Sequence, residues 1–585
     1  MSETKQKSLL LRVLSLTNPY KKEFFISTFL AVILAVIAPA RPFLIQITVD
    51  EYILPSFNEG LQGLLLMTGI LVGLLILESV IRYFFIFIAS WLGQSIIKNL
   101  RTRVFDHITS LKLKYFDRTP IGTSTTRTIN DVETINDIFS EGIITILADL
   151  LTIIVIITVM VYIDWRLTLV SLSVFPLLIY ATYVFKEKVK VSFHTVRGQV
   201  AKMNAFLQEH ITGMKIIQIF NAEEEELNKF KEINKDYRKA NVQAIWYYSI
   251  FFPVIEILTA AAIGLMVWYG ANNVIRDMTS LGTLIAFLLY LNMLFRPLRM
   301  LADKFNTLQM GLVASERVFN ILDTRDRIEN NGSYKPDKIK GHIQFKNVWF
   351  AYENEDYVLK DINFELLPGQ TMAIVGATGS GKTSIINIIN RFYDIQKGEI
   401  LIDGKVIEQY DLYALRENIG NVLQDVFLFS GTIMENITLR NKDMSRDDVI
   451  EAAEICGIHD FIMRLPQGYD FNVMERGATL SLGQRQLIAF IRTLVYDPSI
   501  LILDEATSSI DRESELLIQN AIEKLITNRT SIIIAHRLST IQHADIILVL
   551  DQGEIKESGN HEQLLSQNGY YKRLYEMQFK KTQIA

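Results

Sequence analysis

Cysteine is nearly absent from this chain, since Cys456 is the single one among 585 residues. It stands in an apolar segment, 452–457, that is typical of a packed helix. One cysteine excludes an internal disulfide framework, which fits a reducing compartment for this half of the chain. A basic excess is missing too. The formal net charge is −5, which gives no reason to expect nucleic acid as a partner.

A cleavable signal sequence is also not expected before the first long apolar run. The triplet Leu9-Leu10-Leu11 is too short for one, and the lysines around it (Lys5, Lys7, Lys21 and Lys22) favour an interfacial helix. Hydrophobic residues are plentiful, at 49% of the chain, and they concentrate before residue 320. The length predicts several domains, and this distribution places the apolar one first.

Six apolar stretches in the first 320 residues have the length of membrane-spanning helices. They are 24–47, 61–87, 139–162, 167–183, 245–268 and 281–298. Few helix breakers interrupt the chain between residues 61 and 111, and about fifty helical residues would extend about 75 Å, more than twice the hydrocarbon thickness. Residues 186–243 also have the pattern of long amphipathic helices. We therefore expect helices that project far beyond the membrane on one side.

The distribution of Lys and Arg predicts which side that is. The loop 50–59 has neither residue, and the loop between the fifth and sixth spans has only Arg276. The projections carry many, among them Lys98, Arg101, Arg103, Lys112, Lys114, Arg118, Arg127, Lys186, Lys188, Lys190, Arg197 and Lys202. Positively charged loops stay in the cytoplasm. The chain is thus predicted to be a multi-pass protein of the cytoplasmic (inner) membrane with both termini inside.

Four ionisable residues fall within or near the spans, namely Glu78, Arg82, Asp149 and Glu256. Such residues can line a transport pathway. The spacing of Glu78 and Arg82 equally allows an ordinary pair within one helix. Both interpretations stay open from the sequence. Pro253 and Pro297 are expected to kink the fifth and sixth spans.

The composition changes between residues 323 and 340, where a polar stretch with Asn-Asn-Gly-Ser and Pro336 predicts a linker. Strand and helix patterns alternate after Gly341, as in an α/β domain. Within it, the apolar run 372–375 leads into a glycine-rich turn and a helix start, the context of a phosphate-binding P-loop. Its candidate nucleotide-binding residues are Gly376, Thr378, Gly379, Ser380, Gly381, Lys382, Thr383 and Ser384.

The chemistry of this loop predicts a nucleoside triphosphate and Mg²⁺. Glycines let backbone N–H groups approach phosphate oxygens, and the helix N-terminus adds positive charge. Lys382 can reach the β- and γ-phosphates, and the hydroxyl of Thr383 is placed to bind the metal ion. An ordinary strand–helix turn needs neither this spacing nor the Lys-Thr pair.

Two later strands end in residues that suit ATP hydrolysis. The buried run 500–505 ends in Asp504, which would hold Mg²⁺ through water, and Glu505, which would orient or deprotonate the attacking water. The run 531–536 ends in His536, a candidate sensor of the γ-phosphate. A lone histidine at a strand end is usually structural, but its place after the acidic strand favours the sensor.

A second anion site is predicted where the helix after residue 480 begins. Ser481 suits the N-cap and Gly483 permits close approach, and Ser481, Gly483 and Gln484 are the candidate nucleotide-binding residues of this helix start. One γ-phosphate cannot touch both this turn and the P-loop of the same compact domain. A head-to-tail pair of domains, with nucleotide between them, solves this.

Together these residues resemble an ABC exporter half-transporter of the multidrug or lipid type, over about residues 10–580. The resemblance implies an all-α transmembrane domain of six helices, 1–322, a linker, 323–340, and an α/β P-loop ATP-binding cassette in the cytoplasm, 341–585. It also implies coupling helices near 118–130 and 209–220.

The same resemblance implies roles for further residues. They are adenine stacking for Tyr352, contact with Mg²⁺ and water for the catalytic Gln424, and coupling across a dimer for Glu475 and Asp511. One departure matters: the third position of the family's Leu-Ser-Gly-Gly-Gln signature is Leu482 here. Heterodimeric exporters often alter this loop in one half, so homodimer and heterodimer both stay open.

The resulting expectation is an ATPase that moves hydrophobic or amphipathic compounds out of the cytoplasm by alternating access. Its expected partners are a second half-transporter, the lipid bilayer and a hydrophobic or lipid-like substrate. A dedicated lipid flippase is the alternative within the family. An ATP-gated channel or a regulatory subunit is a further alternative, against which Glu505 and His536 argue.

Overall fold

The computed structural model describes residues 3–54, 61–504, 512–534 and 541–578. The chain forms two compact units. The first comprises Met1–Thr109 and Ile121–Thr324, and the second comprises Ser110–Pro120 and Arg325–Ala585. The short segment Ser110–Pro120 therefore clusters with the residues after the linker, although it follows a long helix of the first unit.

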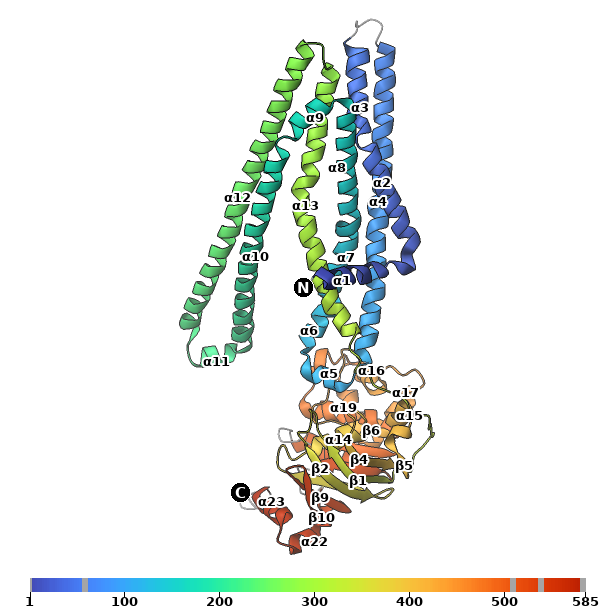
Figure 1. Cartoon of the computed structure of the whole chain (residues 1–585). Coiled ribbons are helices and arrows are strands. Elements are labelled where there is room, and N and C mark those ends of the chain that lie inside the picture. Colours follow the sequence, from blue (N-terminus) through green and yellow to red (C-terminus); the bar gives the residue numbers. More distant parts are fainter. Residues whose placement is uncertain (1–2, 55–60, 505–511, 535–540, 579–585) are drawn as a thin grey trace. The chain divides into compact units, whose positions relative to one another are not determined.

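The first unit is helical throughout its described part (Figure 1). Its α-helices are α1 Glu3–Ser15, α2 Lys21–Ile37, α3 Ala40–Ile47, α4 Leu61–Thr109, α6 Ile121–Thr126, α7 Val132–Asp137, α8 Ile143–Ile163, α9 Trp165–Leu172, α10 Phe175–Thr212, α11 Met214–Ile219, α12 Glu223–Ile275 and α13 Leu281–Leu322. A short 3₁₀ turn, Asn18–Tyr20, precedes α2, and π-helical segments cover Thr48–Ile53, Arg127–Asp131 and Ile138–Gly142.

Among the described residues, five helical stretches are long and apolar enough to cross a membrane. They are Asn18–Ile53, Gln62–Thr109, Ile121–Ile163, Trp165–Thr212 and Glu223–Ile275. The shorter apolar helix Leu281–Pro297 begins α13 and covers the sixth predicted span. Each of the six predicted spans is therefore mainly helical, and the first and fourth are each interrupted by a short turn.

Prolines affect these helices unequally. The first predicted span, 24–47, is divided into α2 and α3, with Pro39 as the residue before α3. The fourth, 167–183, is divided between α9 and α10, and Pro176 stands at the start of α10. Pro253 and Pro297 lie inside α12 and α13, and neither ends its helix. A proline removes one backbone donor, and long packed helices can tolerate that loss.

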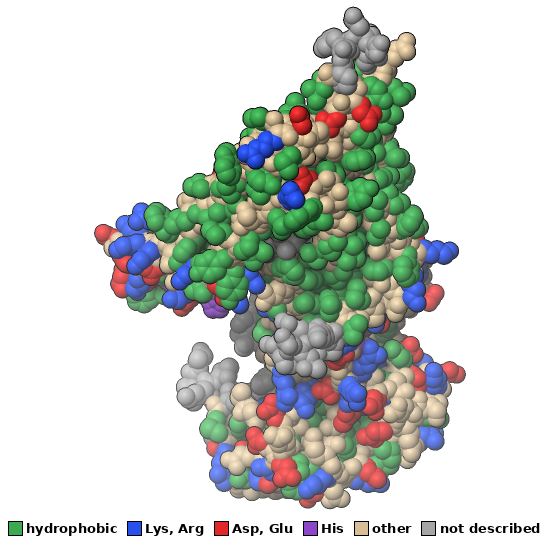
Figure 2. All heavy atoms as spheres, turned by 45° about the horizontal axis from the view of Figure 1, so that its top comes forward, with side chains coloured by type: hydrophobic (Ala, Val, Ile, Leu, Met, Phe, Trp, Pro, Cys, Tyr) green, Lys and Arg blue, Asp and Glu red, His purple; other side chains and the backbone are tan. Residues whose placement is uncertain are grey.

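The surface of the first unit is rich in apolar side chains, as Figure 2 shows. Large exposed examples include Phe25, Leu65, Ile76, Phe87 and Trp268. A helix in water turns such residues inward, whereas a helix in a bilayer exposes them to lipid. The unit also has its own interior, where α8, α12 and α13 bury residues such as Met160, Met266 and Phe287.

The four ionisable residues of the spans have different surroundings. Arg82 and Glu78 form the intrahelical pair, with 2.5 Å between Nη2 and Oε1. Asp149 on α8 pairs with Lys304 on α13. Glu256 lies on an exposed face of α12. Two of these acids are thus neutralised by cations of the same unit.

The second unit is built on two sheets (Figure 1). The four-stranded antiparallel sheet has the order β2-β1-β4-β5, with β1 Ile343–Phe350, β2 Leu359–Leu366, β4 Lys397–Ile402 and β5 Lys405–Val406. The six-stranded sheet has the order β10-β9-β3-β8-β7-β6, with β3 Thr371–Gly376, β6 Ile419–Val422, β7 Ile500–Asp504, β8 Thr530–Ile534, β9 Ile546–Asp551 and β10 Glu554–Gly559.

Five strands of the larger sheet are parallel, and only the edge strand β10 is antiparallel. Strands β3, β7 and β8 read as continuous apolar runs because both faces of a parallel sheet are covered. Their carboxyl ends lie at one edge of the sheet. This edge brings the P-loop, Asp504 and the segment after β6 together.

Helices complete the second unit. They are α5 Leu113–Arg118, α14 Lys382–Ile389, α15 Leu412–Glu417, α16 Ile433–Thr438, α17 Arg446–Ile455, α18 His459–Arg464, α19 Leu482–Val495, α20 Arg512–Ile526, α22 His561–Ser566 and α23 Tyr570–Gln578, with short 3₁₀ turns at Ile407–Gln409, Gly468–Asp470 and Glu475–Gly477. Cys456 caps the end of α17 and is 1% exposed, in agreement with its predicted packed position.

The polar stretch predicted as a linker is closely attached to the second unit from Arg325 onward. The side chain of Asn330 accepts a hydrogen bond from the backbone N–H of Leu412 at 2.8 Å and donates one to Asp411 at 2.9 Å. Tyr334 forms an isolated parallel bridge with Tyr410. These contacts fix the entry of the chain into the unit.

Candidate nucleotide-binding site

The P-loop connects β3, which ends at Gly376, to α14, which begins at Lys382. Two of its glycines have positive φ, +84° at Gly379 and +106° at Gly381. A side chain on Gly376 would place its Cβ 2.2 Å from the carbonyl oxygen of Leu550 on the neighbouring strand β9. The predicted glycines are thus required by backbone geometry and close packing.

Lys382 turns back onto its own loop. Its Nζ donates hydrogen bonds to the carbonyl oxygens of Gly376, at 2.8 Å, and Ala377, at 2.9 Å. Burial lowers the pKa of Lys382, and the nearby charge of Asp504 acts in the opposite direction. An anionic phosphate in the loop would favour the charged ammonium, so Lys382 is poised to exchange carbonyl partners for phosphate oxygens.

Ser380 supplies an independent indication that the loop fits a phosphate. Its hydroxyl is buried and has no hydrogen-bond partner among the described residues. Buried polar groups are normally paired, so an unpaired hydroxyl inside a glycine loop marks a place for an acceptor. Thr378, Gly379 and Thr383 are exposed or partly exposed on the same loop and helix start. The cradle therefore suits the phosphates of a nucleotide.

Tyr352, predicted to stack on adenine, is tied to the P-loop helix. Its hydroxyl lies 3.0 Å from the hydroxyl of Ser384 and accepts a hydrogen bond from Nδ2 of Asn387 at 3.1 Å. Its ring meets that of Tyr393 edge to face, with centroids 5.0 Å apart. Asn387 and Tyr393 were not predicted. Nothing in their local sequence marks them, because their contacts join segments far apart in the chain.

Asp504 ends β7, as predicted, and Gln424 follows β6, the strand paired with β7. Gln424 is exposed, and the loop that carries it is anchored by Asn436. The side chain of Asn436 accepts from the N–H of Phe429 at 2.8 Å and donates to its carbonyl at 2.9 Å. This anchor was also missed from the sequence, although a buried Asn at a helix start is a recognisable signal.

The predicted second anion site begins α19. Ser481 is the N-cap, and it forms a capping box with Gln484. The N–H of Gln484 donates to the Ser481 hydroxyl at 3.3 Å, and the Ser481 N–H donates to Oε1 of Gln484 at 2.9 Å. Gly483 is buried in the first turn, and Leu482 is partly exposed. The predicted N-cap is confirmed, with Gln484 as its reciprocal partner.

This helix is also joined to the predicted coupling residue Glu475. Glu475 lies in the turn Glu475–Gly477, whose Arg476 has φ +54°. Nη1 of Arg485 on α19 donates to the carbonyl oxygen of Arg476 at 3.1 Å. The start of α19 and this turn are therefore directly linked. Glu505, Asp511 and His536 lie outside the described residues.

The comparisons with known proteins decide the family. Residues 24–298 match the family described as ABC transporter transmembrane region, and residues 359–508 match the one described as ABC transporter. The chain belongs to the ABC transporter family. It is an exporter half-transporter, in which the helical transmembrane-type domain is fused to the ATP-binding domain, and it couples ATP hydrolysis to transport.

Three relatives cover nearly the whole chain. An uncharacterized ABC transporter ATP-binding protein of Bacillus subtilis (strain 168) is 38% identical over 97% of this chain and 94% of its own length. A second protein of that organism, named for multidrug export as an ATP-binding/permease protein, is 35% identical over 97% of this chain and 99% of its own length. An ATP-dependent lipid A-core flippase of Syntrophus aciditrophicus (strain SB) is 35% identical over 98% of this chain and 95% of its own length.

Proposed function

We propose that this ABC half-transporter exports hydrophobic or amphipathic compounds of the multidrug type across the cytoplasmic membrane. The observation that carries the proposal is the pairing, in one chain, of a complete phosphate cradle with helices that expose large apolar side chains. A substrate that partitions into lipid can approach such helices from the bilayer. ATP closure of the cassettes would switch the helices between inward and outward access.

In this proposal the nucleotide is ATP with Mg²⁺. Lys382 and the loop amides hold the phosphates, and Thr383, Asp504 and Gln424 hold the metal ion and its water. Glu505 is the general base, and His536 contacts the γ-phosphate. Further contacts to ATP come from Tyr352, Gly376, Thr378, Gly379, Ser380, Gly381, Ser384 and, across the dimer, Ser481, Gly483, Gln484 and Asp511.

A second half-transporter completes each site. The capped start of α19 presents backbone N–H groups and positive helix-end charge, which suit a γ-phosphate held by the P-loop of the other chain. The partner is either a second copy or a related chain, since Leu482 alters the signature. The mass of the purified complex separates the two: an ATPase-active dimer of this chain alone would show two equivalent sites, whereas activity only with a second chain would show a heterodimer.

A dedicated lipid flippase is the second candidate, favoured by the relative named as a lipid A-core flippase. A panel of compounds tested for stimulation of ATP hydrolysis distinguishes the two functions. We expect cationic and neutral amphiphilic dyes to stimulate hydrolysis as well as lipids do. Stimulation by lipids alone would replace the multidrug proposal with the flippase.

The arrangement in the membrane is proposed from the charge distribution, with both termini and the cassette in the cytoplasm. We propose domain bounds of 1–322 for the membrane part, 323–340 for the linker and 341–585 for the cassette. An ATP-gated channel or regulatory subunit would instead let a permeant ion pass down its gradient. Passive flux through the reconstituted protein, independent of hydrolysis, would support that alternative.

A further inference from the structure

A hydrogen bond joins the helix α5 to the aromatic residues beside the predicted adenine site. The hydroxyl of Tyr393 donates to a carboxylate oxygen of Asp117 on α5. Tyr393 is 9% exposed, and its ring packs against Tyr352 and, at 5.8 Å between centroids, against Phe350. Phe350 and Tyr352 are themselves edge to face at 4.7 Å. One face of this three-ring cluster is thus the proposed adenine platform, and its other end holds α5.

Two ion pairs fasten the ends of α5 to the neighbours of the same tyrosines. Nζ of Lys112, just before α5, lies 2.6 Å from Oδ2 of Asp394, the residue after Tyr393. At the other end, Nη2 of Arg118 lies 2.7 Å from Oε1 of Glu353, the residue after Tyr352. Both pairs have exposed members, and such pairs contribute little free energy. They restrict the position of α5. Its stronger attachment is the half-buried hydrogen bond between the buried Tyr393 and the carboxylate of Asp117, which is itself an exposed residue.

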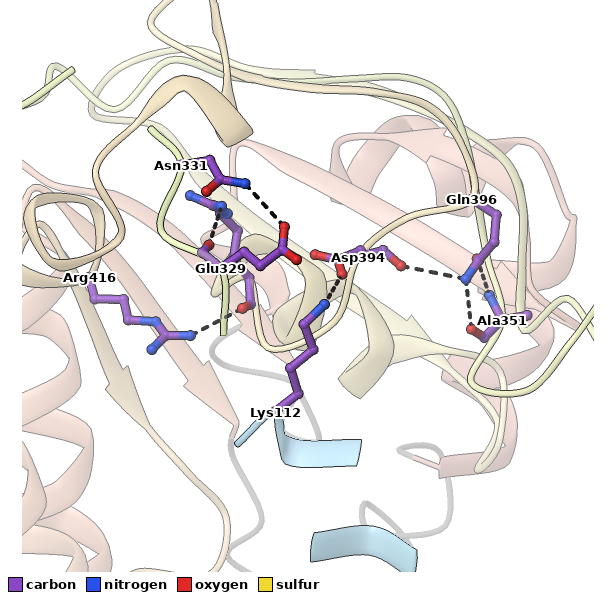
Figure 3. Close-up of polar contacts among 8 residues, drawn as sticks. Lys112, Glu329, Asn331, Ala351, Asp394, Gln396 and Arg416 are labelled. Carbon is purple, nitrogen blue, oxygen red and sulfur yellow. Dashed lines mark hydrogen bonds and ion pairs between the residues drawn. The ribbon is translucent and has the colours of Figure 1, made fainter. Parts of the chain in front are cut away.

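The segment that carries Tyr393 is also hydrogen-bonded to the residue that precedes Tyr352. Gln396 accepts a hydrogen bond from the N–H of Ala351 at 2.6 Å and donates to the carbonyl of Ala351 at 3.0 Å. Figure 3 shows these bonds beside the Lys112–Asp394 pair. Ala351 directly precedes Tyr352, so the two tyrosines are held together by backbone contacts as well as by their rings.

We propose that Tyr393 and Asp117 are a positioning pair, through which occupation of the Tyr352 face by adenine sets the position of α5. The proposal rests on the adenine role proposed for Tyr352. A base that stacks on Tyr352 fixes its ring, and close-packed rings transmit a displacement because no free volume absorbs it. Tyr393 then carries the displacement to Asp117, on the segment that leads into α6 of the first unit.

The chemistry of the pair suits a permanent link. Burial raises the pKa of Tyr393, and the hydrogen bond to Asp117 raises it further, so the phenol stays protonated and remains a donor in the physiological range. The acceptor is a carboxylate, and hydrogen bonds to charged groups are shorter and stronger than neutral ones. Neither residue needs to touch the nucleotide, so both act through Tyr352.

The test measures the response of α5 to nucleotide in the full-length dimer. Hydrogen–deuterium exchange of peptides covering residues 110–120 is compared with and without the non-hydrolysable analogue AMP-PNP and Mg²⁺. We expect the nucleotide to slow exchange there in the parent, and Tyr393→Phe to reduce this protection about fivefold or more, in the range of typical coupling energies. The affinity for the analogue should change less than about threefold, since one hydrogen bond distant from the ligand is removed.

Two sets of variants control this result. Tyr410→Phe removes another buried phenol hydroxyl of the same unit, which donates to the carbonyl of Ile402 at 2.7 Å. It should leave the nucleotide response of residues 110–120 intact. Asp117→Asn keeps an oxygen acceptor for Tyr393 and should retain most of the response, whereas Asp117→Ala should lose it.

The outcomes separate this proposal from the one on which it rests. Tyr352→Ala that binds the analogue as tightly as the parent would refute the adenine role itself. Weakened binding in Tyr352→Ala, together with full protection of residues 110–120 in Tyr393→Phe, would overturn the positioning pair alone. If Tyr393→Phe does not fold, equal responses of Asp117→Asn and Asp117→Ala would overturn it instead.

Discussion

Gly381 offers a direct test of the P-loop geometry, because alanine at this position is opposed by two separate effects. Its φ of +106° disfavours any side chain, which costs about 1–2 kcal/mol. The new Cβ would also lie 2.7 Å from Cδ2 of Leu359, a residue that is fully buried. Forcing apart such a packed contact costs about 1–3 kcal/mol more. Gly381→Ala should therefore destabilise the second unit by about 2–5 kcal/mol.

Gly404→Ala is the matched control. Gly404 has φ +78°, but no described heavy atom lies within 4 Å of the position its Cβ would take. Gly404→Ala thus introduces the backbone strain without the steric clash, and it should lower the free energy of unfolding by about 1–2 kcal/mol. It also lies in the turn between β4 and β5, away from the P-loop.

Thermal unfolding of the purified full-length protein in detergent compares the two variants. For a domain of this size, each kcal/mol lowers the midpoint by about 2–4 °C. We expect Gly381→Ala to unfold several degrees below Gly404→Ala and to bind ATP more weakly, because its backbone N–H groups no longer converge on the phosphates. Equal midpoints and equal ATP affinities for the two variants would refute this geometry of the loop.

Two further predictions concern the same unit. Asn436 is 1% exposed, and Asn436→Ala leaves the N–H and the carbonyl of Phe429 without their side-chain partner. The variant should lose about 2–3 kcal/mol of unfolding free energy, measured by denaturant titration. An unchanged unfolding midpoint would contradict the role of Asn436 in holding this loop. Hydrogen bonds from Asn330 and the N–H of Ala414 lower the pKa of Asp411 in the folded protein to about 2, below the pKa of an aspartate in the unfolded chain. The ionised Asp411 therefore contributes its full stabilisation of the fold above the unfolded pKa, and this stabilisation is lost as the pH falls through about 2. Thermal midpoints should then show parent and Asp411→Asn converging between about pH 4 and pH 2; a constant difference would exclude this linkage.

The sequence was most informative where local pattern and chemistry coincide. The P-loop needs glycines at fixed positions between a strand and a helix, and β3 and α14 lie where this spacing places them. The capping box of Ser481 and Gln484 is likewise a local motif. The long helix predicted between residues 61 and 111 is α4. A long apolar segment without helix breakers can satisfy its backbone hydrogen bonds in a membrane in few other ways than as a helix.

Other features depend on contacts that no local pattern records. The attachment of α5 joins residues 112–118 to residues more than two hundred positions later in the chain. The unpaired hydroxyl of Ser380 and the return of Lys382 onto its own loop depend on the folded backbone. The divisions of the first and fourth spans do have local signals, Pro39 and Pro42 in the first and Pro176 in the fourth, but the hydropathy of a segment does not register a proline as a break.

Transport into inverted proteoliposomes tests most directly the claim that ATP hydrolysis drives vectorial export. An amphiphilic fluorescent dye is supplied outside, where the cassettes face, and its accumulation is followed with ATP and Mg²⁺ for the parent and for Glu505→Gln. We predict ATP-dependent accumulation by the parent, with a loss of about a hundredfold in hydrolysis and a matching loss of transport in Glu505→Gln, while ATP binding persists. Dye flux that is equal with and without ATP, or unchanged in Glu505→Gln, would contradict the claim.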